Sequence, residues 1–190
     1  MSETVTTAAG QVGAVGPGRL VLVVGPSGAG KDTLLRLARE ACQGDSRIVF
    51  PRRAITRASD GSEDHDSLSA ADFERAMSEG AFCVWWQAHG HSYGIPASAE
   101  EAIRAGNTVV CNVSRAVIAS LRQRYAHVTV VTVTAPAEVL AQRLASRKRD
   151  SDDLASRRAR ATADVEADVI ISNVGDPARA AAELLAIIRT

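Results

Sequence analysis

This chain of 190 residues has few lysines and few aromatic residues, and its formal net charge is zero. Aromatic side chains make up 4% of it, and Lys31 and Lys148 are its only lysines, so arginine supplies nearly all of the positive charge. The 22 basic and 22 acidic residues cancel. A neutral chain gives no support for non-specific binding to nucleic acid or membrane surfaces, and we expect neither as a partner. No apolar run approaches the length of a transmembrane span.

Metal-binding and disulfide patterns are also missing. The cysteines Cys42, Cys83 and Cys111 are far apart, and neither they nor the four histidines show metal-site spacing. Such cysteines are typical of buried thiols in a reducing compartment, which predicts a cytoplasmic protein. Residues 1–18 lack the basic start of a signal peptide and are expected to form a flexible tail. Residues 19–190 suffice for one compact domain, in an oligomeric state that the sequence leaves open.

A phosphate-binding pattern is the strongest signal that is present. The apolar run 20–24 predicts a buried strand, and a helical stretch follows at 32–41. The glycines and Lys31 between them form a loop in which backbone N–H groups, the lysine and the helix N-terminus can all meet phosphate oxygens. A plain glycine-rich turn would not require a lysine there. We expect ATP to bind at Gly25, Pro26, Ser27, Gly28, Ala29, Gly30, Lys31, Asp32 and Thr33.

Strands and helices alternate along most of the remaining chain, which predicts a parallel sheet covered by helices on both faces. Ser69 and Asp72 form an N-cap signal for a helix that Gly80 ends. Further strands are predicted at residues 47–55, 82–87, 108–113, 127–133 and 168–172. The segment 56–93 interrupts the alternation with a hairpin pattern. We expect it to be an insert over the strand ends, where ligands bind in such sheets.

Three further stretches resemble the guanylate kinases. They are Ala54-Ile55-Thr56-Arg57 with Gly61-Ser62-Glu63, the segment 82–96, and the arginine-rich stretch 144–157. Together with the phosphate loop, the similarity extends over nearly everything from residue 19 onward. It implies the α/β fold of a nucleoside-monophosphate kinase, a parallel sheet flanked by helices, with an acceptor-binding insert at 56–95 and an arginine-rich lid at 147–158.

Departures from the guanylate-kinase pattern concern the residues that read the base. Val84 and Ile95 stand where that family carries a glutamate and a hydroxyl residue that hydrogen-bond guanine, and Asn112 stands where an aspartate is usual. A site that lacks such partners should lose discrimination by orders of magnitude. The acceptor is therefore expected to retain a phosphate monoester and to lack guanine.

The motifs at 25–33, 63–66, 86–90, 93–96 and 112–115 together resemble a narrower family, the ribose 1,5-bisphosphate phosphokinases of bacterial phosphonate utilisation. These enzymes transfer the γ-phosphate of ATP to the 1-phosphate of ribose 1,5-bisphosphate, giving 5-phosphoribosyl 1-diphosphate and ADP. The resemblance implies the same reaction here. Two alternatives are a guanylate or other nucleoside-monophosphate kinase, and a binding module without turnover, which the intact phosphate loop argues against.

The nucleophile in such a reaction is a phosphate oxygen that is already ionised, so no general base is required. Catalysis then consists of in-line positioning and charge neutralisation. The expected catalytic residues are Lys31, Arg57, Arg147 and Arg157. Arg149 and Asn173 are expected beside the nucleotide, and Mg²⁺ near Asp32 and Thr33. Asp32 could contact the metal directly, contact it through water, or only start the helix.

The remaining candidates concern a small phosphorylated sugar as the acceptor. The expected acceptor-binding residues are Arg53, Arg57, Glu63, His65, Asp66, Tyr93, Asn112 and Arg115. The choice between Arg52 and Arg53 stays open. Simpler alternatives are a solvated loop for the acids, a solvated helix face for the lid arginines and a strand-end cap for Asn173. Trp85 and Trp86 alternate along one strand, so one should be in the core and the other should face the acceptor.

Overall fold

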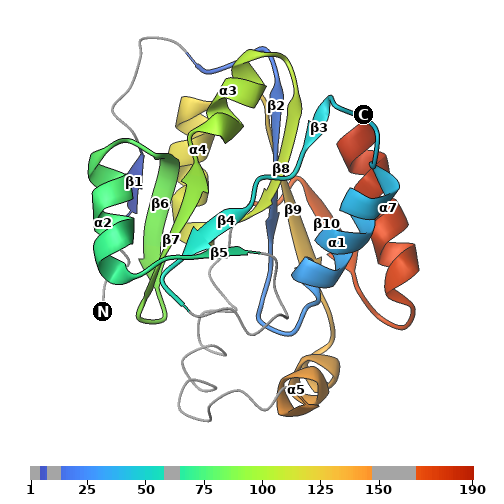
Figure 1. Cartoon of the computed structure of the whole chain (residues 1–190). Coiled ribbons are helices and arrows are strands. Elements are labelled where there is room, and N and C mark those ends of the chain that lie inside the picture. Colours follow the sequence, from blue (N-terminus) through green and yellow to red (C-terminus); the bar gives the residue numbers. More distant parts are fainter. Residues whose placement is uncertain (1–4, 8–13, 58–64, 147–165) are drawn as a thin grey trace.

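The computed structural model describes residues 5–7, 14–57, 65–146 and 166–190. Its centre is a five-stranded parallel sheet with the strand order β10-β9-β2-β8-β3 (Figure 1). β2 lies in the middle and is buried, as its unbroken apolar sequence predicts. The strands are β2 (Arg19–Val24), β3 (Ile48–Val49), β8 (Thr108–Asn112), β9 (Val128–Thr134) and β10 (Val169–Ser172).

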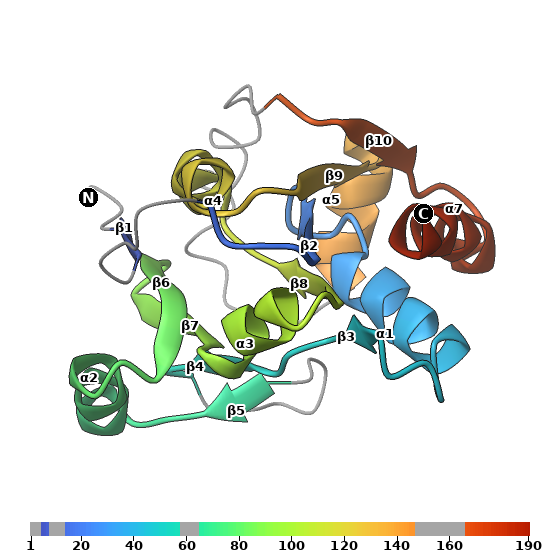
Figure 2. The same cartoon turned by 90° about the horizontal axis from the view of Figure 1, so that it is seen from above.

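Helices cover both faces of this sheet (Figure 2). They are α1 (Lys31–Ala41), α7 (Pro177–Arg189), α3 (Ser98–Arg104) and α4 (Ile118–Arg124), the last preceded by the 3-10 turn η1 (Arg115–Val117). On one face, α1 and α7 contribute Leu34 and Leu184 to one core cluster. On the other, α3 and α4 contribute Ile103 and Leu121 to a second cluster. This arrangement confirms the predicted fold class. In the described part of the chain, no helix combines the length and the apolar content that crossing a bilayer requires.

A second, mixed sheet lies beside the first, with the strand order β1-β6-β7-β4-β5. Its strands are β1 (Val5–Thr7), β4 (Arg53–Ile55), β5 (His65–Ser67), β6 (Phe82–Ala88) and β7 (His91–Pro96). α2 (Ala70–Ser78) covers its outer face, where the rings of Phe73 and Phe82 stack 4.7 Å apart. The Ser69 hydroxyl caps this helix by accepting a hydrogen bond from the Asp72 N–H, as predicted. The inner face packs into the core cluster that α3 and α4 also join.

The predicted strand 47–55 is two strands that belong to different sheets. β3 pairs with β8 in the parallel sheet, whereas β4 pairs with β7 and β5 in the second sheet. Pro51 lies between them and has no N–H group to donate to a continuous ladder. The chain therefore crosses from one sheet to the other at residues 50–52, and Arg53 is the first residue of the strand that enters the second sheet.

The N-terminal segment differs in part from the predicted flexible tail. Residues 5–7 form β1, which pairs antiparallel with β6 and covers that edge of the second sheet. Val15 is buried, and its N–H donates to Arg124 O at 2.8 Å while its carbonyl accepts from Ala126 N at 2.9 Å. Short pieces of the segment thus have defined partners in the fold.

A largely buried polar network joins α3 to α4. Glu100 Oε2 accepts hydrogen bonds from Arg124 Nη2 at 2.7 Å and from the Tyr125 hydroxyl at 3.0 Å, and Oε1 accepts one from Arg104 at 2.9 Å. Burial alone would raise the pKa of Glu100, but the hydrogen bonds from these partners outweigh it and lower the pKa below its ordinary value. The network fixes the helix layer that separates the two sheets.

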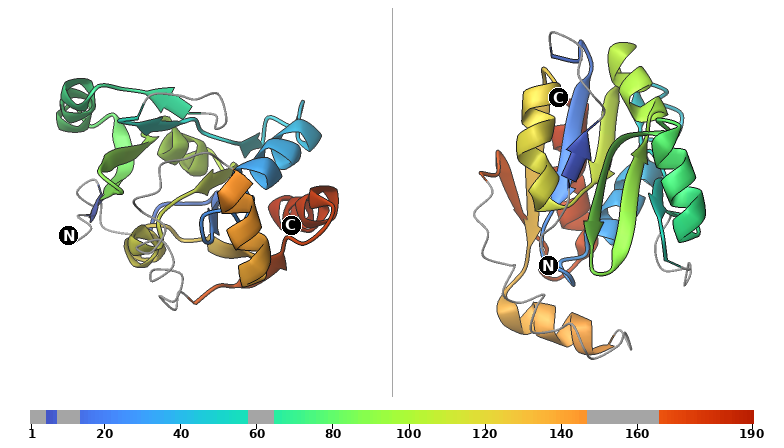
Figure 3. Two further views of the ribbon diagram at one scale, coloured as in Figure 1. Left: turned by 90° about the horizontal axis from the view of Figure 1, so that it is seen from below. Right: turned by 90° about the vertical axis from the view of Figure 1, so that its left-hand side faces the viewer.

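Loops gather at the carboxyl ends of the parallel strands. Seen from below (Figure 3, left), α5 (Ala137–Ser146) lies across this end of the molecule. Arg143 of α5 reaches the loop that joins β2 to α1, where it donates to Gly28 O at 3.4 Å. Ligand sites of open α/β sheets occur at this end of the strands.

Candidate active site

The loop between β2 and α1 has a backbone suited to binding phosphate. Gly25, Gly28 and Gly30 have φ angles of 145°, 84° and 90°. Gly30 is also the N-cap of α1, and no side chain caps the first turn of this helix. A Cβ atom at Gly30 would overlap the side-chain nitrogen of Asn173. The uncapped helix N-terminus, whose partial positive charge favours anions, therefore opens into a tightly packed glycine loop.

Lys31, the first residue of α1, folds back over this loop. Its ammonium group donates hydrogen bonds to Gly25 O at 2.8 Å and to Pro26 O at 3.0 Å. A phosphate oxygen is a stronger acceptor for an ammonium group than a neutral carbonyl is. Lys31 therefore lies where it can exchange these bonds for bonds to phosphate.

Asn173 and Arg143 hold the loop from its other side. Asn173 follows β10 and is 2% exposed, and its Nδ2 donates to Ala29 O at 2.7 Å. Arg143 donates to Gly28 O, as described above, and to Asn173 O at 3.1 Å. Asn173 belongs to the predicted site, and its Oδ1 is buried without a partner. Arg143 was not among the predicted site residues, because membership of an arginine-rich stretch was its only signal in the sequence.

Asp32 is bound across the end of the parallel sheet. Its Oδ1 accepts a hydrogen bond from Asn112 Nδ2 at 2.9 Å, which ties the start of α1 to the end of β8. Among the described residues, no cluster of three or more His, Cys, Asp or Glu side chains could hold a metal ion. Mg²⁺ commonly uses one or two carboxylates together with substrate phosphates and water. Asp32 and Thr33 beside the phosphate loop fit that requirement, and Asn112 fixes the carboxylate.

A stack of three side chains lies on the inner face of the second sheet. The Trp86 and Tyr93 rings, from paired positions of β6 and β7, stack 5.4 Å apart with an interplanar angle of 5°. The Arg53 guanidinium carbon lies 5.6 Å from the centroid of the Tyr93 ring. Val84 and Ile95, also paired, are buried beside the stack in the same core cluster. This face thus combines one positive charge with buried aromatic and apolar side chains, and Val84 and Ile95 are the two positions at which the sequence predicts that no group reads guanine.

The two tryptophans divide as the alternation predicts. Trp86 is 2% exposed on the inner face, where it supports Tyr93. Trp85 packs instead against the small cluster under α2 on the outer face. Trp86 is thus the tryptophan in the core, and both rings serve packing; that either ring faces the acceptor stays a prediction.

Arg52 and Arg53 point to opposite sides of the second sheet. Arg52 is exposed, where its Nε lies 3.0 Å from Asp66 Oδ1 and its Nη2 donates to His65 O. Arg53 lies on Tyr93 on the inner face. Asp66, a predicted acceptor residue, therefore pairs with Arg52 at the outer surface and is not brought to the inner face.

His65 lies beside Arg53 on the inner face. The two residues are register partners in the parallel pair of β5 and β4, so their side chains project to the same side. The His65 side chain is buried, at 4% exposure, and neither ring nitrogen has a hydrogen-bond partner. Such groups are rare in folded proteins and call for a ligand or water to complete them. Glu63, the neighbouring candidate, lies outside the described residues.

Arg57 is placed by hydrogen bonds between the end of β4 and β7. The Thr56 N–H donates to Ser92 O at 3.0 Å, and the Thr56 hydroxyl accepts from the Ser92 N–H at 2.8 Å. His91 Nδ1 donates to Thr56 O at 3.0 Å. Arg57 is therefore held at one end of β4 while Arg53 is at the other. Arg115 begins η1 directly after β8. The lid candidates Arg147, Arg149 and Arg157 lie outside the described residues.

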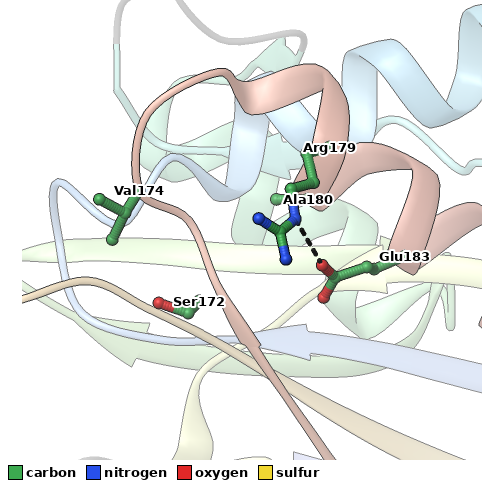
Figure 4. A pocket seen from close by; sticks show the side chains of 5 residues that line it. All are labelled: Ser172, Val174, Arg179, Ala180 and Glu183. Atoms are coloured by element: carbon green, nitrogen blue, oxygen red, sulfur yellow. Dashed lines mark ion pairs between the residues drawn. The ribbon is translucent and has the colours of Figure 1, made fainter.

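A separate hollow occurs between β10 and α7. It is lined by Ser172, Val174, Arg179, Ala180 and Glu183 (Figure 4). Arg179 Nε lies 3.7 Å from Glu183 Oε1 within it. None of the predicted site residues lines this hollow, although Asn173 lies between two that do.

Comparisons with known proteins agree with this geometry. A family model described as an AAA domain matches residues 20–169. Ribose 1,5-bisphosphate phosphokinase PhnN of Bradyrhizobium diazoefficiens is 55% identical over 192 aligned positions, covering 100% of this chain and 97% of the relative. The PhnN protein of Rhodopseudomonas palustris is 54% identical, with 92% of this chain and 90% of the relative covered.

Solved structures support the fold independently. The crystal structure of guanylate kinase from Anaplasma phagocytophilum superimposes with a TM-score of 0.66 at 22% identity, over 93% of this chain and 86% of that one. The low identity limits this likeness to the architecture, whereas the two PhnN relatives share more than half of their aligned residues with this chain over 90% or more of their length. The chain thus belongs to the family of the ribose 1,5-bisphosphate phosphokinases PhnN.

Proposed function

We propose that this protein transfers the γ-phosphate of ATP to the 1-phosphate of ribose 1,5-bisphosphate, giving 5-phosphoribosyl 1-diphosphate and ADP. The observation that carries the proposal is the inner face of the second sheet. There the Arg53 guanidinium lies over Tyr93, beside the apolar Val84 and Ile95. Arg53 offers charge for a phosphate, and Val84 and Ile95 supply neither a carboxylate nor a hydroxyl group to a purine. The names of the PhnN relatives support the same acceptor.

The reaction needs positioning more than proton transfer. An oxygen of the 1-phosphate forms a bond to the γ-phosphorus while the bond from that phosphorus to the bridging oxygen of ADP breaks. Lys31 would neutralise the β- and γ-phosphates after leaving the carbonyls that it now contacts. Arg57, Arg147 and Arg157 would neutralise the remaining charge, with Arg149 and Asn173 beside the nucleotide.

Mg²⁺ would be held at Asp32 and Thr33. When bound, the ion would supply positive charge that helps to neutralise the phosphates. Asn112 holds the Asp32 carboxylate beside the phosphate loop, where it would meet the ion directly or through water. Tyr93, His65 and Arg115 complete the proposed acceptor side.

A reducing compartment, the cytoplasm, fits the cysteines. Cys42, Cys83 and Cys111 are buried free thiols. Burial raises the pKa of Cys83 to about 11 and that of Cys111 to about 12. Both thiols therefore remain protonated near neutral pH and supply no nucleophile.

Product identification tests the function directly. Purified protein is incubated with ATP, Mg²⁺ and either ribose 1,5-bisphosphate or guanosine monophosphate, and ADP is counted against phosphorylated product. We expect one 5-phosphoribosyl 1-diphosphate for each ADP, and little turnover with the nucleotide. A better reaction with guanosine monophosphate would replace the proposal by guanylate kinase activity. ATP binding without turnover of either acceptor would indicate a binding module.

A further inference from the structure

The acceptor of the proposed reaction carries two phosphates, and the second sheet has an arginine near each end of β4, Arg53 at its start and Arg57 two residues beyond its end. We propose that Arg53 and His65 form a subsite for the second, non-reacting phosphate, whereas Arg57 serves the phosphate that attacks ATP. This inference rests on the proposed function and deepens it. It makes Arg53 and His65 the residues that select a bisphosphorylated sugar over a monophosphorylated one.

The placement of Arg53 indicates a ligand site in the interior. Its guanidinium packs on Tyr93, which in turn packs on Trp86, so an aromatic pair fixes its position. Its positive charge also reaches Cys111 on β8 and lowers the pKa of that thiol, against the larger effect of burial. The guanidinium thus lies on the inner face, on a ring that belongs to the core cluster shared with the parallel sheet.

His65 provides an independent observation at the same place. The residue is 4% exposed, and both ring nitrogens lack a hydrogen-bond partner. A buried polar group without a partner costs about 1–3 kcal/mol. The register pairing with Arg53 places the two side chains next to one another on one face. A phosphate oxygen there would accept a hydrogen bond from the imidazole and a charge-assisted one from Arg53.

The positions of Arg53 and Arg57 suit two separate phosphates. Arg53 begins β4, and Arg57 lies two residues beyond its end, where Thr56 is fastened to Ser92. The two guanidinium groups therefore start from opposite ends of one strand. Between them the face is lined by buried apolar side chains such as Ile55, so the anionic ends of the ligand must meet the arginines.

Arg52 is the matched control. It has the same charge one position earlier, but it is exposed and pairs with Asp66 on the outer face, and its bond to His65 is to the backbone carbonyl and not to the imidazole. A general effect of losing positive charge would follow from Arg52→Met and Arg53→Met alike. An effect of the subsite would follow from Arg53→Met alone.

The kinetic test compares ribose 1,5-bisphosphate with ribose 1-phosphate, which lacks the second phosphate. We expect wild-type protein to prefer the bisphosphate and Arg53→Met to reduce that preference in kcat/KM by about 10- to 100-fold, the value of a charge-assisted hydrogen bond. Arg52→Met should keep the full preference. An equal loss with both acceptors would mean that Arg53 binds the reacting phosphate, and an unchanged preference would likewise overturn the subsite.

A binding measurement separates the subsite from the reaction. Ribose 5-phosphate carries only the non-reacting phosphate, and its affinity is measured by calorimetry without ATP. We expect binding to wild type and Arg52→Met, weaker binding to Arg53→Lys, and none to Arg53→Met; His65→Phe should bind at least about 10-fold more weakly. Equal affinity in all variants would overturn the inference. If ribose 5-phosphate binds through Arg53 but no sugar bisphosphate is phosphorylated, the proposed function fails and the subsite stands.

Discussion

Lys31 is the residue on which the proposed chemistry depends most. Its ammonium group donates hydrogen bonds to two carbonyls of a partly buried loop. Water can take its place at these carbonyls, so we expect the removal of Lys31 to change the stability of the fold little. We expect Lys31→Ala to lower the rate of ADP formation by about 100-fold or more, because charge on the transferring group is left uncompensated. Thermal unfolding should change little. Arg36→Ala, on the exposed side of the same helix, is the control and should retain wild-type activity. Normal turnover by the Lys31 variant would remove this residue from the mechanism.

Val84 and Ile95 are the two residues that we expect to exclude guanine as part of the acceptor. They are register partners on β6 and β7, each 2% exposed. Val84→Glu combined with Ile95→Ser restores groups that can hydrogen-bond a guanine, at the cost of burying a carboxylate. We expect the ratio of guanosine monophosphate to sugar bisphosphate turnover to rise at least about 10-fold. The ratio is measured in parallel ADP assays, and an unchanged value would show that these positions do not read the acceptor.

The phosphate loop packs against the residue that follows β10. Asn173 Nδ2 donates a hydrogen bond to Ala29 O, and it lies so close to the position that a Cβ atom at Gly30 would take that the two atoms would overlap. Gly44 offers a matched comparison, since its φ of 92° is close to the 90° of Gly30 but nothing lies within 4 Å of a Cβ there. We expect Gly44→Ala to cost about 1 kcal/mol of stability from backbone strain alone. Gly30→Ala should cost more and also weaken ATP binding, as measured by chemical denaturation and calorimetry. Equal losses in the two variants would contradict the coupling of Asn173 to the loop.

The elements that could be predicted from the sequence are those with local signals. Ser69 and Asp72 predict the start of helix α2, and in the structure the Ser69 side chain accepts a hydrogen bond from the Asp72 N–H. The phosphate loop was predictable because all of its residues are contiguous. The contact of Asn112 with Asp32 was not, since it joins residues 80 positions apart. The inner placement of Arg53 was also unpredictable, because Arg52 and Arg53 are adjacent residues of the same type and only the pairing of β4 tells them apart.

Stability of the whole molecule should depend on pH through Glu100. Its folded pKa lies below the ordinary value of 4.5 because three neighbours donate hydrogen bonds to the carboxylate. A depressed folded pKa stabilises the fold above the unfolded pKa, and this contribution is lost as the pH falls through the folded value. We expect Glu100→Gln to lower the unfolding free energy at pH 7 by about 1 kcal/mol or more. Urea titrations should find that this difference shrinks below about pH 4. A difference that stays constant with pH would contradict the assignment.

The crossing at residues 50–52 is a short link between the two sheets, and its length bears on the distance between the two proposed substrate sites. The loop proposed for the phosphate donor belongs to the parallel sheet, and the face proposed for the acceptor belongs to the second sheet. Only three residues link β3 of the one to β4 of the other. Lengthening this link would leave each substrate its own contacts and alter the separation of the reacting atoms. The short link therefore helps to set the distance between the proposed donor and acceptor sites.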